Sequence, residues 1–106
     1  MTAANGSQSP RYRVVLIGLA KEEFLALVRR ARPSGRSAMI VEALRSAEKE
    51  LESRPIEAGD PLYRLRHMKM LICRAVFPPL FSEYGVHEDR PVVIIRHVAG
   101  LADAID

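Results

Sequence analysis

The period of the hydrophobic pattern changes along the chain. Residues 12–20 form an apolar run rich in β-branched side chains, which predicts a strand. Over residues 21–31 and again over 37–54, apolar positions recur every three or four residues, which predicts two amphipathic helices. Pro33 and Gly35 lie between them, and proline disfavours helical geometry in the residue before it. The first half therefore predicts a strand followed by a helical hairpin.

The second half alternates with a period of two. A loop is expected at residues 55–61, where prolines enclose short polar and small residues. Pro78 and Pro79 cannot donate backbone hydrogen bonds and predict a turn, and residues 88–91 predict a hairpin turn. The four strands of this half are expected at residues 62–67, 70–77, 80–87 and 92–98.

Together these elements predict a single α+β domain of the order β-α-α-β-β-β-β. Each helix has one apolar side, so the hairpin is expected to pack on one face of a small, mainly antiparallel sheet. Residues 1–10 are small and polar and predict a disordered tail, because they hold no apolar run to bury. The domain is expected over residues 11–101, with a short C-terminal tail at 102–106.

The composition excludes several classes of protein. The chain of 106 residues has room for one domain. Its single cysteine, Cys73, lies in an apolar run and predicts a buried, reduced thiol in a cytoplasmic protein. One cysteine and three scattered histidines give no zinc-ligand spacing, so neither a metal nor a cofactor is expected. No stretch approaches the ~18 to 20 apolar residues of a membrane span, so no membrane partner is expected.

The net charge of +3 is modest, but it is unevenly distributed. Residues 61–82 carry four bases and no acid, and residues 29–36 carry four arginines. Such clusters suit a polyanion or an acidic partner, and solvated charge on an ordinary domain gives the same pattern. The candidate nucleic-acid-binding residues are Arg64, Arg66, Lys69, Arg96, Arg29, Arg30, Arg32 and Arg36.

The clearest candidate for chemistry is Arg74, in the middle of an expected strand. If side chains alternate, Cys73 and its like-sided neighbours face the helices, and Arg74 shares the open face with Glu83 and His87. An arginine beside a glutamate is typical of a structural ion pair, and a histidine at a strand end is typical of a surface position. The sharper hypothesis is an RNA-facing pocket in which Arg74 holds a phosphate and Glu83 or His87 transfers a proton. These three residues are the candidate catalytic set.

Two segments add a resemblance to a known family. Residues 59–66 read Gly-Asp-Pro-Leu-Tyr-Arg-Leu-Arg, and residues 83–96 read Glu-Tyr-Gly-Val-His-Glu-Asp-Arg-Pro-Val-Val-Ile-Ile-Arg. With the order of elements, they resemble the RelE/ParE superfamily of bacterial type II toxin–antitoxin systems, over roughly residues 12 to 101. The resemblance implies a small basic cytosolic protein neutralised by an antitoxin. An acidic or amphipathic antitoxin segment is expected over the helix hairpin or along a sheet edge.

The resemblance implies two kinds of activity. RelE-like members cut mRNA in the ribosomal A site, whereas ParE-like members poison DNA gyrase without a nuclease site. The RelE type uses bases on the second strand, an arginine early in the next strand, another after the last strand, and often a C-terminal tyrosine. Arg74 matches a second-strand base, but Phe81 and Ala102 occupy the next two arginine positions. Placing Arg64 and Arg66 in the second-strand role requires an inserted strand.

Most of the nuclease set is therefore missing. The sequence favours a toxin-type protein that inhibits growth by binding RNA, the ribosome or gyrase. Two alternatives stay open: an active, metal-independent, ribosome-dependent mRNA endoribonuclease, and a non-toxic interaction module that shares only the fold.

Overall fold

The computed structural model describes residues 11–101. The predicted order of elements is confirmed, and the expectations for residues 1–10 and 102–106 lie outside the described residues. None of the helices within residues 11–101 is long and apolar enough to cross a membrane. The elements are β1 (Arg13–Leu16), α2 (Gly18–Ala31), the 3-10 helix η1 (Arg32–Ser34), α3 (Ser37–Ser53), β2 (Asp60–Leu65), the 3-10 helix η2 (Arg66–Met68), β3 (Met70–Phe77), β4 (Leu80–His87) and β5 (Val92–Gly100).

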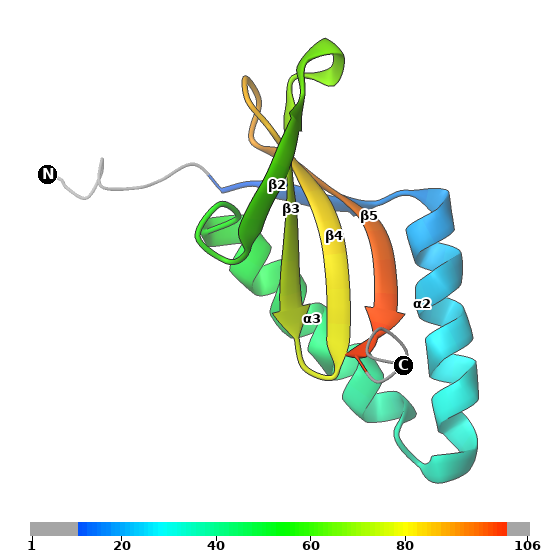
Figure 1. Ribbon diagram of the computed structural model, residues 1–106. Helices are drawn as coiled ribbons and strands as arrows, with labels where there is room; N and C mark the ends of the chain where they lie inside the picture. The colour runs from blue at the N-terminus through cyan, green and yellow to red at the C-terminus, as the bar shows by residue number, and fades with distance from the viewer. Residues whose placement is uncertain (1–10, 102–106) are drawn as a thin grey trace, which may run out of the picture.

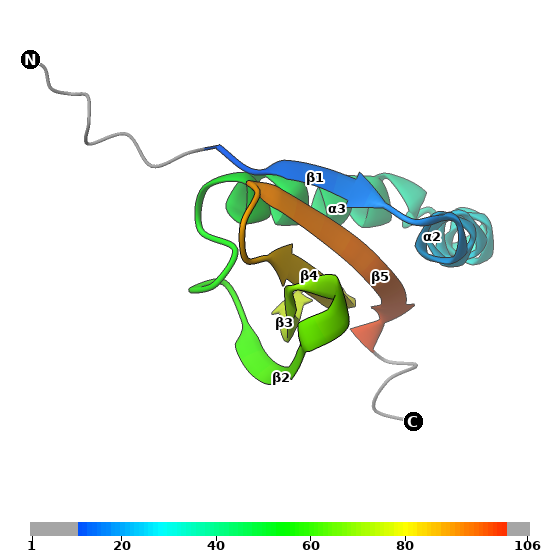
Figure 2. The same cartoon turned by 90° about the horizontal axis from the view of Figure 1, so that it is seen from above.

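The five strands form one sheet in the order β1-β5-β4-β3-β2. β1 runs parallel to β5, and the other three pairings are antiparallel, which confirms the predicted α+β class. Figure 1 shows α3 crossing behind the sheet and α2 running beside β5. Seen from above in Figure 2, both helices lie on the side of β1, and β2 lies at the opposite end of the strand order. One face of the sheet is therefore covered by helices, and the other is left open.

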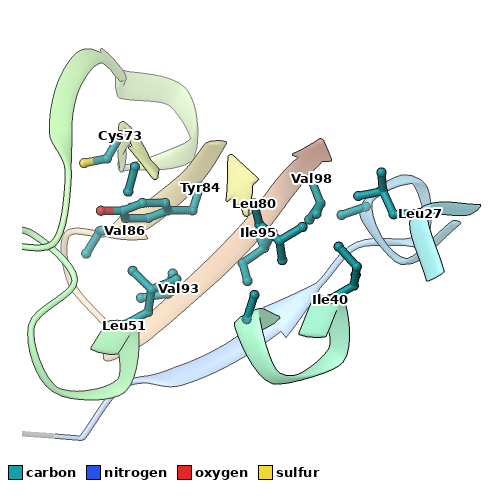
Figure 3. Close-up of a cluster of buried hydrophobic side chains, with 13 residues drawn as sticks. Leu27, Ile40, Leu51, Cys73, Leu80, Tyr84, Val86, Val93, Ile95 and Val98 are labelled. Atoms are coloured by element: carbon teal, nitrogen blue, oxygen red, sulfur yellow. The ribbon is translucent and has the colours of Figure 1, made fainter. Parts of the chain in front are cut away.

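The helix-facing side of the sheet forms the hydrophobic core. On β3, Cys73 and Ala75 point into it, as the alternation predicts. Leu27 of α2 and Ile40 and Leu51 of α3 complete it, and Figure 3 shows these side chains meeting the strands. On the remaining strands, the buried members of the same cluster are Leu80, Tyr84, Val86, Val93, Ile95 and Val98.

The first strand is shorter than the predicted residues 12–20. Its parallel register with β5 ends where Leu16 pairs with Ile95, and α2 begins two residues later. Beyond that point the edge of β5 is covered by the helix: the carboxylate of Glu23 accepts the backbone N–H of Val98 at 2.9 Å. An apolar run alone does not separate a strand from the start of a buried helix.

The second strand lies two residues earlier than predicted, at Asp60–Leu65, and residues 66–68 form a 3-10 turn. Its start is fixed by the loop before it. The hydroxyl of the fully buried Tyr84 donates to the carbonyl of Pro55 at 2.8 Å. Gly59 passes so close that a Cβ there would lie 2.6 Å from the Tyr84 hydroxyl and 2.6 Å from the carbonyl oxygen of Arg74. This anchor determines which β2 side chains reach the open face.

Candidate functional site on the open face of the sheet

The open face is defined here as the side of the sheet that points away from α2 and α3. Its central row follows from the strand register. Tyr63 pairs with Ile72, Ile72 with Gly85, Gly85 with Ile94, and Ile94 with Val15. Register partners point to the same side of a sheet, so one apolar row crosses all five strands.

A glycine shapes the middle of this row. A Cβ at Gly85 would lie 2.6 Å from Cε of Met70 and 3.2 Å from Cδ1 of Ile72. Because Gly85 has no side chain, both residues pack over β4 and are almost fully buried. The alternation predicts the face of Ile72 correctly but not its burial on the open side.

The charged side chains of the face are not paired as the alternation suggests. Arg74 and Glu83 are register partners, as expected. However, Oε2 of Glu83 lies 3.7 Å from Nη1 of Arg96, which also donates to the Tyr63 hydroxyl at 3.5 Å. An irregularity in the β4–β5 register near Glu83 accompanies this placement of Arg96. Arg74 instead lies over the ring of Phe81, 5.4 Å from its centroid.

The third candidate catalytic residue, His87, is separate from the other two. It pairs with Met70, four residues along β4 from Glu83, which is roughly 13 Å of strand. Its Nδ1 accepts the backbone N–H groups of Asp89 and Arg90, each at 3.1 Å. A neutral ring then carries its proton on Nε2, so the accepting nitrogen is already occupied by the turn. The structure therefore places Arg74 and Glu83 side by side as register partners, without an ion pair between them. His87 instead holds the β4–β5 turn.

The basic corner formed by β2, η2 and the start of β3 lies against acids of that same turn. Arg64 forms an ion pair with Glu88, and Lys69 pairs with Asp89 at 3.0 Å. The hydrogen bond from Lys69, followed by its charge, lowers the pKa of the Asp89 carboxyl. Arg66 is exposed. Two of the four bases of residues 61–82 are thus paired with acids at least twenty residues away.

Four of the candidate nucleic-acid-binding residues lie elsewhere, at the tip of the helical hairpin (Figure 1): Arg29, Arg30, Arg32 and Arg36. Two of them, Arg30 and Arg36, line part of a groove that the sequence did not predict. The groove has two lobes, about 290 Å³ and 430 Å³, that share the side chain of Met39, which is 54% exposed. The sequence signal that could have identified this groove is Met39, an apolar residue that lies next to the buried side of α3 and is not part of it. We call this feature the Met39 groove; its lining includes Leu27, Arg30, Arg36, Ile40, Val76, Phe77, Pro79 and Leu101.

Comparison with known proteins places this architecture in a class. No protein-family model and no curated protein matches the chain. Among solved structures, a chain of the RelBE2 toxin–antitoxin complex from Mycobacterium tuberculosis superposes with a TM-score of 0.61 at 18% identity, covering 88% of this chain and 94% of that one. A chain of the chromosomal ParDE toxin–antitoxin system from P. aeruginosa gives 0.60 at 8% identity, covering 88% and 99%. The chain therefore has a RelE/ParE-like fold, as the sequence resemblance predicted.

Proposed function

We propose that this protein is the toxin-type component of a toxin–antitoxin module and that it arrests growth by binding its target without cutting RNA. The fold supports the first part. The second part is supported by one observation, the arrangement of proton-transferring groups around Arg74. Cleavage of RNA needs a base and an acid within reach of one phosphate. Glu83 pairs with Arg96 instead, and His87 lies roughly 13 Å along the strand with one ring nitrogen occupied.

The proposed antitoxin partner is supported by the Met39 groove. Its floor is apolar, and Arg30 and Arg36 line one lobe, with Arg29 and Arg32 close by in sequence. An amphipathic helix with acidic residues on its polar side matches this combination, and such segments commonly fold when they bind.

The test is inducible expression of the full chain in a bacterial host, with and without the adjacent open reading frame. We expect growth arrest with intact transcripts, relief of the arrest by the adjacent frame, and transcripts that are equally intact with the parent chain and with Arg74→Ala. Primer extension on abundant mRNAs measures transcript integrity. Absence of arrest would contradict a toxin role and favour a non-toxic interaction module.

The second candidate function is the mRNA endoribonuclease, favoured by the state of Arg74 itself. Its side chain is exposed, and none of the ion pairs within residues 11–101 includes it, so it is open to a phosphate. This candidate predicts cut transcripts on induction, and loss of both cutting and arrest in Arg74→Ala. The same experiment therefore separates the two functions.

A further inference from the structure

We propose that the open face of the sheet is a docking surface for a protein, so that the target of growth arrest is a protein and not an RNA strand. This inference rests on the proposed function for the existence of a target. It commits to a partner surface of stated chemistry: an acidic side chain that meets Arg74, a basic one near Glu83, and apolar side chains on either side of them.

The first argument is the balance of charge. A nucleic-acid strand carries a negative charge at every phosphate, and neutralising bases provide most of its affinity. On and beside the open face, Arg64, Lys69 and Arg96 are each already paired with an acid. An RNA strand would have to displace those carboxylates, including the one on Glu83 at the centre of the face. A protein surface carries both signs and can complement Arg74 and Glu83 together.

The second argument is the exposed apolar surface of the same face. Tyr63 is 47% exposed, and at the other end of the same row Val15 is 38% exposed. Ile17, just after β1, is 39% exposed and extends the apolar surface beyond Val15. Within the row, Ile94 lies between Val15 and Gly85. Five strands at about 4.8 Å spacing make this row roughly 19 Å wide. Apolar side chains around a central arginine and tyrosine are typical of the core of a protein–protein interface.

The third argument concerns stacking. Binding of single-stranded RNA depends on aromatic rings whose faces are open to bases. Arg74 lies over the ring of Phe81, and the hydroxyl of Tyr63 accepts a hydrogen bond from Arg96. Arginines thus hold both aromatic side chains of the face, Tyr63 and Phe81, in place. The resulting surface of charged and apolar groups is ordered before binding, which suits a folded protein partner.

The decisive variant is Glu83→Gln, because the two target classes predict opposite results. Removing this carboxylate makes the face more basic, so an RNA strand would bind equally well or better. A protein partner with a base facing Glu83 would bind more weakly, and we expect about tenfold more protein to be needed for half-maximal arrest, equivalent to about 1.4 kcal/mol of binding. The matched control is Glu22→Gln, an exposed glutamate of α2 that lies outside the open face and the Met39 groove, for which we expect no change.

A second measurement identifies the chemical class of the contact directly. The full chain carries a photo-crosslinking benzoylphenylalanine at position 63 and is irradiated in arrested cells, with the same group at position 56 as a control. We expect adducts at position 63 that survive ribonuclease, disappear with protease and weaken in Glu83→Gln. Ribonuclease-sensitive adducts, or a Glu83→Gln variant at least as potent as the parent, would overturn the protein target while leaving a toxin role intact. Absence of arrest in the parent strain would instead overturn the proposed function.

Discussion

The two faces of the central strands differ in what holds their side chains in place. Toward the helices, Val93 and Ile95 are fully buried among apolar neighbours, and close packing decides their positions. On the open face, Arg96 and Glu83 are only partly exposed and are placed by an ion pair and a register irregularity. The helix side therefore carries most of the stability of the fold, and the open side is the surface that we propose for recognition.

The strongest test of this contrast uses two adjacent isoleucines of β5. Ile95 is fully buried on the helix side, and Ile94 is half-buried on the open side. We expect Ile95→Ala to lower the free energy of unfolding by about 2–5 kcal/mol, because it removes buried methyl groups and leaves a cavity. Ile94→Ala should cost less than about 1.5 kcal/mol. Urea unfolding followed by circular dichroism measures both, and equal losses would contradict the division of roles.

The next effect concerns the anchor that positions β2. Gly59→Ala would place a Cβ against the Arg74 carbonyl and the Tyr84 hydroxyl, so we expect a loss of about 1–3 kcal/mol of unfolding free energy. Gly18→Ala is the matched control, because a Cβ there meets nothing within 4 Å. That control should be neutral or stabilising by up to about 1 kcal/mol, since alanine reduces the freedom of the unfolded chain. Thermal unfolding of both variants gives the comparison, and similar losses in the two would contradict a close approach at Gly59.

A smaller effect is expected for Tyr84→Phe, which removes the hydrogen bond to Pro55 and leaves a carbonyl without its donor. The cost should be about 1–2 kcal/mol. Burial raises the pKa of the Tyr84 hydroxyl above its ordinary value of about 10. The unfolded chain therefore loses this proton first, and stability should fall as the pH rises above about 10. Urea midpoints between pH 8 and 11 should fall less steeply in Tyr84→Phe, and parallel profiles would contradict this assignment.

The smallest effect lies on the open face itself. Glu83→Gln and Arg96→Gln break an ion pair that is still partly exposed to water. Their coupling free energy in a double-mutant cycle should be about 0–1 kcal/mol and should shrink with added salt. A larger, salt-independent coupling would mean that the open face also contributes to the core stability of the fold.

Much of the architecture was predictable because it depends on short-range periodicity. The helical spacing of Ile40 and Leu51 predicted α3, and the alternation of Cys73 and Ala75 predicted the core face of β3. The errors occurred where periodicity is ambiguous. The run at residues 12–20 is divided between β1 and α2, and the period does not show where the parallel register with β5 ends.

The candidate site was predictable only as a set of residues on one face. The side of Arg74 and Glu83 follows from counting along strands, but their partners do not. Arg96 reaches Glu83 alongside a register irregularity, and Phe81 lies beneath Arg74 across the hairpin. Similarly, the Met39 groove exists only because the hairpin tip, the β3–β4 turn and the end of β5 meet.

The sequence by itself determined the α+β class, the order of elements and the side of the sheet that the residues of β3 face. The physical reason is that these properties follow from backbone geometry, which has a period of 3.6 in helices and 2.0 in strands. Only the tertiary structure decided that Glu83 pairs with Arg96 and that Glu88 pairs with Arg64. Ion pairing depends on distances of a few ångströms between residues far apart in the chain, and strand register sets those distances. The open face therefore presents a mixture of charges where the sequence alone indicated a basic surface.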